Sequence, residues 1–521
     1  MKPKAGFLSL AEELRLYILS FLSCRDILRC TSVCKALRQT YLSSSELQYI
    51  VELNGQRLLP VPNTDDHTPT SERLQLLRDR AHVWFKVDFH SSETVFIPDV
   101  SDYVDQFVAD GHLYLWDAHE DKAAIIPILP KPSQQRIERN WSPGTLCSVP
   151  NSTNLDVFMN PAQNLIAVVY RIVDDERLYI QLRALYSDSD HSQAAGRTLF
   201  PSGLPGYDNE WINATLKGCG RHIALQCWLM VEADALGDYS KCVWQLQIWE
   251  WQHSTTSSST LSGILLNPVV DPTDFCFLGN DRLLVVADDL KIYSIEDMSR
   301  APQLLACFLS PVPLRNIRCL LPMDNIGHSS QMQAQRTMYT SDPTNRLLCL
   351  TVSGLVFIIS TRIFFDLHGM PAAVTPIPWN QWGPSNARVF GRPSYYNVHV
   401  SGNRLLLQSL QVQRTALDFE HYIFQMLDFS PLAAMNRRGL GRLVTEPYTV
   451  DISDCTGRPG ESLTTSLPYV EVESDRMFIM FEDTLIDRDR IYLLDWEPEV
   501  EGSTPPTYLA TRSSRVEVID F

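Results

Sequence analysis

Hydrophobic and polar positions show two different patterns of spacing along the chain. Up to about residue 45, apolar residues recur at helical spacing, whereas from about residue 90 short apolar runs alternate with Asp, Asn, Gly and Pro. The first pattern predicts amphipathic helices and the second predicts short strands joined by turns. Helical spacing also continues on either side of the polar loop PVPNTDDHTPT. The sequence therefore predicts an α+β multidomain protein with a helical domain at 1–45, a helical linker at 46–88 and an all-β domain at 89–521.

The first predicted helix carries an unusually wide apolar face. Nine of the thirteen residues from Leu10 to Leu22 are apolar. On a helical projection, seven of them form one continuous arc of about 140°: Tyr17, Leu10, Phe21, Leu14, Ile18, Ala11 and Leu22. Leu16 and Leu19 fall outside this arc, among polar residues. Three short helices bury too little surface to account for so much apolar area, so the arc indicates a partner surface.

Serines are spaced so that each of the three expected helices has an N-cap. Ser9 precedes Glu12 by three residues, and Ser23 precedes Asp26 by the same spacing. This is the pattern of a capping box or a related cap. Ser32 stands before the apolar positions of the third expected helix. The sequence thus predicts N-caps at Ser9, Ser23 and Ser32.

The all-β region contains a loose repeat of paired strands. Seven such units have centres near residues 114, 180, 248, 292, 356, 424 and 492, with intervals of 66, 68, 44, 64, 68 and 68. Radial repetition of small sheets at regular spacing is typical of a β-propeller. Seven blades are favoured, with six or eight as alternatives, and a β-sandwich or two unrelated β domains would be a different solution. The final stretch SRVEVIDF is expected to pair with an early strand such as ETVFIP and close the ring.

Charge and composition exclude several classes of partner. The chain has 61 acidic and 44 basic side chains, a formal charge of −17, which argues against binding nucleic acid or an anionic membrane surface. No stretch reaches about 18 uncharged apolar residues, so no membrane span is expected. The N-terminal apolar run mimics a signal peptide, but Glu12, Glu13 and Arg15 interrupt it and no small-residue cleavage site follows, so none is expected. The expected location is cytoplasmic, nuclear or both.

Catalytic and metal-binding motifs are missing from the sequence. There is no HExxH, G-x-S-x-G or P-loop motif, and the twelve cysteines include no C-x-x-C pair. We therefore expect no catalytic residue, no metal site and no cofactor. Acidic turns such as VDDE, ADD and DRDR leave a propeller hydrolase as one alternative, because paired carboxylates can cleave glycosides. The basic cluster Arg437, Arg438 and Arg442 is interpreted as a solvated loop.

The stretch LSLAEELRLYILSFLSCRDILRCTSVCKAL resembles the F-box, a three-helix module of about 45 residues. Twelve positions match its pattern in order and spacing: Leu10, Glu12, Glu13, Leu14, Ile18, Phe21, Leu22, Asp26, Ile27, Val33, Cys34 and Lys35. Two positions depart from it, since Ala11 stands where proline is common and Leu37 where tryptophan is common. Both changes keep the local chemistry, because alanine suits a first helical turn and leucine is apolar.

This resemblance implies a non-catalytic substrate receptor of a ubiquitin ligase. An F-box docks on a Skp-type adaptor and, through it, on a cullin–RING ligase, while the domain behind it recruits a protein substrate. The layout resembles expanded fungal F-box families with a C-terminal propeller-like domain. The residues expected at the adaptor are Leu10, Ala11, Leu14, Ile18, Leu22, Ile27, Val33, Cys34 and Leu37, some of which must also hold the helices together. The alternative is an adaptor-bound scaffold without ligase activity. The substrate and its binding residues are not identified by the sequence.

Overall fold

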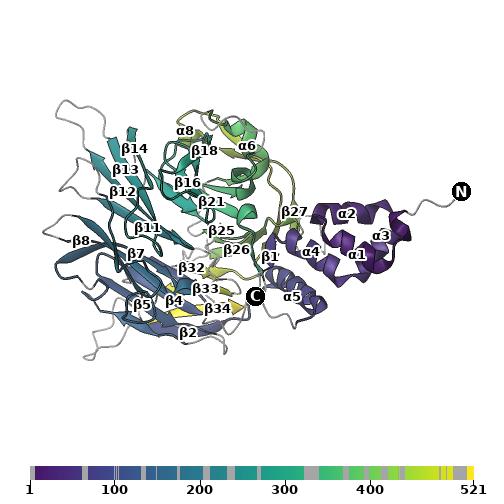
Figure 1. The fold of residues 1–521 in the computed structure, drawn as a ribbon, viewed down its shortest axis with the longest axis horizontal. Coiled ribbons are helices and arrows are strands. Elements are labelled where there is room, and N and C mark those ends of the chain that lie inside the picture. Colours follow the sequence, from purple (N-terminus) through teal and green to yellow (C-terminus); the bar gives the residue numbers. More distant parts are fainter. Residues whose placement is uncertain are drawn as a thin grey trace, which may run out of the picture.

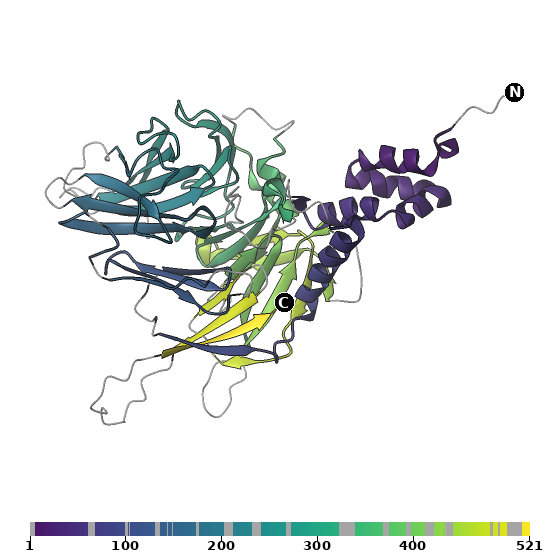
Figure 2. The same cartoon turned by 60° about the horizontal axis from the view of Figure 1, so that its bottom comes forward.

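The chain forms a helical module at one end and a ring of small β-sheets at the other, as the computed structural model shows (Figures 1 and 2). The structure describes the following residues: 6–60, 68–98, 100, 103, 105–130, 136–142, 144–147, 149–172, 177–202, 212–231, 241–266, 272–321, 339–367, 375–391, 398–411, 421–431, 433, 441–479, 483–487, 490–496 and 513–520. Arg437 and Arg438 of the basic loop, and the VDDE turn, lie outside them.

Five α-helices build the helical end. They are α1 (Glu12–Ser20), α2 (Cys24–Val33), α3 (Lys35–Ser43), α4 (Ser45–Gly55) and α5 (Thr70–Val83). Figure 1 shows α1, α2 and α3 farthest from the sheets, with α4 and α5 between them and the ring. Helices α1 to α4 share one internal hydrophobic cluster, which is separate from the cores of the β domain. None of the helices in the described part of the chain is long and apolar enough to cross a membrane.

One of the three predicted N-caps is present. Ser23 precedes α2, and its hydroxyl oxygen accepts the Asp26 N–H at 3.2 Å. The prediction for Ser9 was wrong, because this residue lies in a 3₁₀ turn and α1 begins after Ala11. The prediction for Ser32 was also wrong, because α2 continues through it. Its hydroxyl donates to the Arg29 carbonyl oxygen at 2.7 Å, a bond that serine commonly makes inside helices.

Seven antiparallel sheets form the blades of a β-propeller in the described residues. In strand order they are β3–β4–β5–β6 (Asp105–Ala109, His112–Asp117, Lys122–Pro127, Arg139–Trp141), β7–β8–β9–β10 (Ser152–Asn160, Leu165–Ile172, Leu178–Ala184, Thr198–Leu199), β11–β12–β13–β14 (Asn213–Cys219, His222–Val231, Lys241–Glu250, Thr260–Leu266), β15–β16–β17–β18 (Asp274–Phe277, Arg282–Val286, Leu290–Ser294, Gln303–Phe308), β19–β21–β22–β23 (Arg318–Leu320, Leu347–Val352, Leu355–Ser360, Ala387–Phe390), β24–β25–β26–β30–β27 (Val398–Ser401, Arg404–Gln411, His421–Asp428, Tyr469–Glu473, Arg442–Val444) with β31 (Phe478–Ile479) beside β26, and β32–β33–β34–β2 (Asp483–Ile486, Arg490–Trp496, Ser513–Asp520, Glu93–Pro98). The expected propeller with seven blades is confirmed.

The last blade joins the two ends of the β domain. Strand β34 near the C-terminus pairs with β33 on one side and with β2 on the other, with Val516 opposite Val95. These are the segments SRVEVIDF and ETVFIP, so the expected closure of the ring is confirmed. Closure of this kind leaves no open end in the ring of blades, at which further strands could add.

Neighbouring blades share one hydrophobic core at each of the seven contacts around the ring. The middle strands are therefore covered on both faces, and β8 and β22 are buried along almost their whole length. This explains why they appear in the sequence as continuous apolar runs rather than as an alternation. The seven repeat centres fall on the paired middle strands of the seven blades.

Smaller elements decorate two blades and connect the ring to the helices. Helix α6 (Trp379–Asn386) packs beside blade 5, while the hairpin of β28 (Tyr448–Asp451) and β29 (Ser462–Thr465) encloses the short helix α8 (Ser453–Thr456). Between α4 and α5, strand β1 (Leu58–Pro60) pairs with β20 (Tyr339–Ser341), which precedes the second strand of blade 5. The helical module is therefore attached to the propeller by hydrogen-bonded strand pairing as well as by the polypeptide chain that connects them.

Candidate docking site

Helix α1 separates its apolar residues into an internal and an external set. Leu19 is 3% exposed and, with Leu16 beside it, joins the cluster of the helical module. Ile27 of α2, and Leu47 and Val51 of α4, are buried in the same cluster. Leu16 and Leu19, which lie outside the predicted arc, are thus the residues that hold α1 to the other helices. Of the arc, Leu22 also packs against this cluster, whereas Leu14, Tyr17, Ile18 and Phe21 are exposed.

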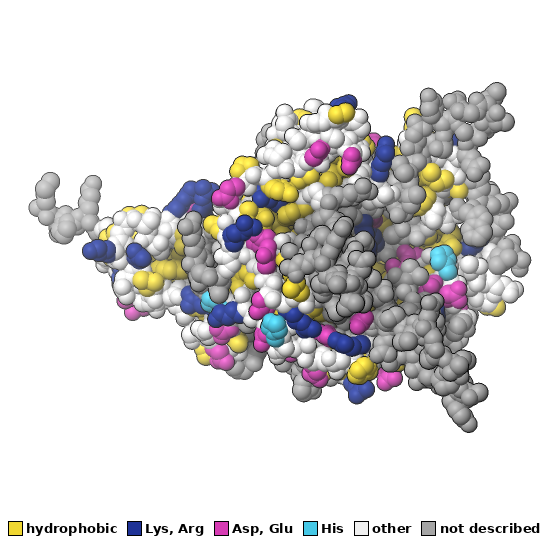
Figure 3. Space-filling model, turned by 180° about the vertical axis from the view of Figure 1, so that it is seen from behind, with side chains coloured by type: hydrophobic (Ala, Val, Ile, Leu, Met, Phe, Trp, Pro, Cys, Tyr) yellow, Lys and Arg dark blue, Asp and Glu magenta, His cyan; other side chains and the backbone are white. Residues whose placement is uncertain are grey.

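The opposite face of α1 is an apolar strip in water. Leu14, Tyr17, Ile18 and Phe21 are 52%, 64%, 42% and 71% exposed, and they follow the i, i+3, i+4, i+7 spacing of one helix face. We name these four residues the α1 stripe. The rings of Tyr17 and Phe21 meet edge to face, with centroids 4.8 Å apart. Figure 3 shows hydrophobic side chains on the surface of the helical module, beside Lys and Arg side chains.

The other predicted adaptor-binding residues divide into three groups. Ala11, which precedes α1, and Val33, the last residue of α2, are exposed. Leu10, Leu22 and Cys34 are half-buried. Two residues are buried inside the module, namely Ile27 and Leu37. We assign these two to its interior rather than to a docking surface.

Tyr17 and Phe21 were not among the sequence-predicted docking residues, although both belong to the predicted arc. They are among the largest and most exposed side chains of the stripe. The signal that identifies them is their helical spacing from Leu14 and Ile18. Aromatic residues at the centre of an exposed patch commonly contribute strongly to protein binding, so these two rings are strong candidates for contacts with a partner.

A second set of candidate groups lies on the first strands of the blades, several of which contact the first strand of a neighbouring blade. The first residues of β15 and β32 are Asp274 and Asp483, and Asp156 follows a bulge in β7. Each accepts a hydrogen bond from the next blade: Asp156 from the Leu216 N–H at 2.6 Å, Asp274 from the Cys319 N–H at 2.7 Å, and Asp483 from the Gln106 amide at 2.5 Å. These carboxylates therefore hold adjacent blades together. In the described residues no group of His, Cys, Asp and Glu is placed to hold a metal ion.

We expect Asp156 to make the stability of the propeller depend on pH. A bulge in β7 precedes this residue, and burial raises the pKa of its carboxyl to about 7. The folded protein therefore takes up this proton at a higher pH than the unfolded chain, and stability contributed by Asp156 increases as the pH falls from about 8 towards about 5. We expect Asp156→Asn to remove that contribution.

The measurement is thermal unfolding of wild type and Asp156→Asn at about pH 8 and about pH 5.5. The melting temperature of the wild type, relative to the variant, should be higher at the lower pH. All other titratable groups are the same in the two proteins, so their contributions cancel in this difference. An identical response of the two proteins would show that Asp156 has no raised pKa.

The helical module matches a known family. Residues 7–40 match the family model described as F-box domain. They form an F-box. The match covers the α1 stripe and helices α1 and α2 completely, and most of α3. F-box domains bind Skp-type adaptors, and F-box proteins are generally non-catalytic substrate receptors. The chain thus combines an N-terminal F-box with a propeller of seven blades.

Comparisons of the whole chain add little beyond the F-box. No curated protein matches the sequence. Among solved structures, similar chains include the WD40 domain of SCAP from fission yeast, at 7% identity and a TM-score of 0.32, covering 82% of this chain and 98% of that one. Another is apo AztD from Citrobacter koseri, at 11% identity and a TM-score of 0.27, covering 63% and 68%. These likenesses are too weak to carry an argument, and the propeller fold rests on its strand pairings.

Proposed function

We propose that this protein is the substrate receptor of a cullin–RING ubiquitin ligase. The F-box docks on a Skp-type adaptor through the α1 stripe, together with Ala11 and Val33, and the propeller recruits a protein substrate. The observation that supports this proposal most strongly is the stripe itself. Four large apolar side chains face water on a module whose internal cluster is already complete without them. Such a patch on a small module is typical of an interaction site.

The contribution of a receptor of this kind is proximity. Holding a substrate close to a charged ubiquitin-conjugating enzyme turns a bimolecular transfer into one within a single complex. In this proposal no side chain of the receptor has to react. We accordingly assign no catalytic residue and no cofactor to the chain.

The cysteines support a reducing compartment, such as the cytoplasm or the nucleus. All twelve lie in the described ranges and none forms a disulfide. Eight are buried in the β domain, where they act as small apolar residues. Secreted proteins commonly use cysteines as disulfides, so this pattern favours an intracellular site of action.

The test is reconstitution of the full chain with a purified Skp-type adaptor and a cullin–RING subunit. We expect one complex that contains all three proteins on size-exclusion chromatography. Failure to bind the adaptor would contradict the proposal. Binding of the adaptor without the cullin, and without ubiquitin transfer to any captured protein, would instead identify the chain as a scaffold without ligase activity.

A further inference from the structure

The junction between the F-box and the propeller is built from both main-chain and side-chain contacts. Strand β1 pairs with β20 over three residues, with Leu58 opposite Ser341. Next to this pair, the Asp342 N–H donates to the Arg57 carbonyl oxygen at 2.9 Å. Arg57 has a left-handed backbone with φ 55°, which is costly for a residue other than glycine and persists only where its surroundings enforce it. The chain is therefore held in one conformation where it leaves α4.

The side chain of Arg57 connects the junction to two blades. Its Nη1 lies 3.5 Å from the carbonyl oxygen of Asn345, just before β21 of blade 5, and 3.4 Å from Oδ1 of Asn403, between β24 and β25 of blade 6. Burial lowers the pKa of the guanidinium, and the nearby charges of Asp428 and Asp342 oppose that shift. The Arg57 side chain is half-buried, and these partners stabilise its charge there. Rotation of the helices about β1 would remove both contacts to the blades.

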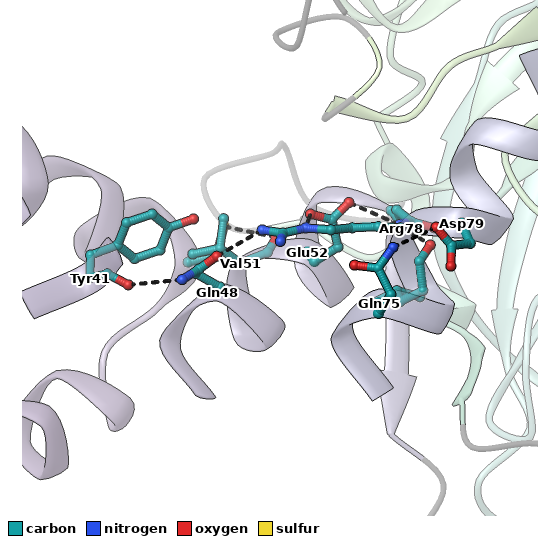
Figure 4. Close-up of polar contacts among 10 residues, drawn as sticks. Tyr41, Gln48, Val51, Glu52, Gln75, Arg78 and Asp79 are labelled. Atoms are coloured by element: carbon teal, nitrogen blue, oxygen red, sulfur yellow. Dashed lines mark hydrogen bonds and ion pairs between the residues drawn. The ribbon is translucent and has the colours of Figure 1, made fainter. Parts of the chain in front are cut away.

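A second set of polar contacts joins α4 to α5 (Figure 4). Arg78 on α5 donates to Oε1 of Gln48 at 2.9 Å and faces the buried carboxylate of Glu52 at 3.5 Å. Gln56 bonds both to Glu52 and to the Leu77 carbonyl oxygen, each at 3.1 Å. Helix α4 is thus fixed against α5 along most of its length.

The same helices are tied at both ends. Towards the F-box, the Gln48 amide donates to the Leu42 carbonyl oxygen at 3.0 Å, near the end of α3. Towards the propeller, the Arg80 guanidinium of α5 lies over the Tyr339 ring of β20, 5.2 Å from its centroid. Polar contacts therefore run without a gap from the F-box, through α4 and α5, to the blades.

We propose that Arg57 and Arg78 are positioning residues which make the F-box and the propeller one rigid body. This inference rests on the proposed function for its purpose: a target on the propeller would be held at a fixed distance and direction from the adaptor.

The contacts of Arg57 also determine which end of the propeller ring faces the F-box. Asn345 and Asn403, which Arg57 contacts, lie at the ends of the blades opposite to the starts of β19 and β24. The end of the ring that holds Arg318 and Val398 therefore points away from the F-box.

The experiment is single-molecule energy transfer on the full chain. Donor and acceptor dyes are attached through encoded non-natural amino acids at Gln39 on α3 and Thr256 on blade 3, two exposed positions far from the junction. We expect one narrow distribution of transfer efficiency in the wild type. The double variant Arg57→Ala, Arg78→Ala should widen it about twofold or more, because local restraints on the helices are lost.

Two further variants make the result specific. Arg300→Ala removes an exposed ion pair with Asp297 on the propeller and should leave the distribution unchanged. Arg57→Gln keeps a hydrogen-bonding amide but no charge, and it replaces the double variant if that protein loses its thermal transition. We call the double variant and Arg57→Gln the junction variants. A wide distribution of energy-transfer efficiency in the wild type, or an unchanged width in the junction variants, would overturn the proposal. These readings need no adaptor, so they are independent of whether the proposed function holds.

A second readout separates positioning from mere folding. In the reconstituted ligase, the junction variants should bind the adaptor with unchanged affinity, because the α1 stripe is intact. Ubiquitin transfer to lysines of the propeller should fall several-fold, since alignment is lost while binding is kept. If the junction variants showed a widened distribution of energy-transfer efficiency but transferred ubiquitin as fast as the wild type, the assignment of a positioning role would be overturned.

Discussion

The double substitution Leu14→Asp, Ile18→Asp is expected to abolish binding of a Skp-type adaptor and to leave the F-box folded. Both side chains are exposed, and neither belongs to the cluster that holds the helices together. Burying one such side chain at an interface contributes about 1.5–3 kcal/mol. Losing two therefore costs about 3–6 kcal/mol, a reduction in affinity of roughly 10²- to 10⁴-fold. Titration calorimetry gives the affinity, and far-ultraviolet circular dichroism checks the helices.

Two controls separate docking from folding. Leu19→Asp places a charge in the interior of the module, where the side chain is only 3% exposed, and it should remove helical signal as well as binding. Thr256→Asp with Gln303→Asp adds the same charge at exposed positions on the propeller and should have no effect on affinity. If Leu14→Asp, Ile18→Asp bound the adaptor as the wild type does, the α1 stripe would not be the docking surface.

Val516→Asp is expected to unfold the propeller. Val516 lies on β34, between β33 and β2, and its side chain is completely buried in the core between the last and the first blade. An unpaired carboxylate at that position costs several kcal/mol, which is a large share of the stability of a domain. The loss should be global, because the same strand closes the ring.

The measurement is thermal unfolding followed by near-ultraviolet circular dichroism, since tryptophans and tyrosines are packed in the blades. We expect no cooperative transition in Val516→Asp. Phe96→Ser provides the matched control in the same blade, because Phe96 lies on β2 but is mostly exposed, and it should melt like the wild type. Normal melting of Val516→Asp would mean that closure by β34 is dispensable.

Much of this architecture is visible in the sequence for a physical reason. The middle strands of each blade are covered by neighbours on both sides, so each blade leaves a pair of apolar runs at regular spacing. The pairing of β34 with β2 could be predicted because a propeller closes by joining a late strand to an early one. The surplus apolar residues of α1 are visible in the same way, because helical spacing places Leu14 and Ile18 on one face.

The sequence could not separate the docking residues from the internal ones. That division depends on α2 and α4, which share the cluster of Leu19 and leave the α1 stripe in water, and their packing direction is a tertiary feature. For the same reason Ile27, which matches the F-box pattern, and Leu37, which departs from it, were both predicted at the adaptor and are nevertheless buried. Ser9 and Ser32 have the spacing of N-caps, but local spacing alone did not reveal where α1 begins or that α2 continues.

The junction was also beyond prediction. Arg57 follows a helix and precedes a polar loop, a context in which arginine is commonly solvated. Its partners Asn345 and Asn403 are far away in the sequence and are brought to it only by the pairing of β1 with β20. Contacts between distant segments of this kind leave no periodic pattern in either segment.

The most direct test of the docking surface is hydroxyl-radical footprinting of the full chain with and without a Skp-type adaptor. Tyr17 and Phe21 are well exposed aromatic side chains, so both should be oxidised readily in the isolated protein. Bound adaptor is expected to protect both rings strongly, while the exposed Phe96 on the propeller keeps its rate. Unchanged oxidation of Tyr17 and Phe21 in the complex would contradict docking through the α1 stripe.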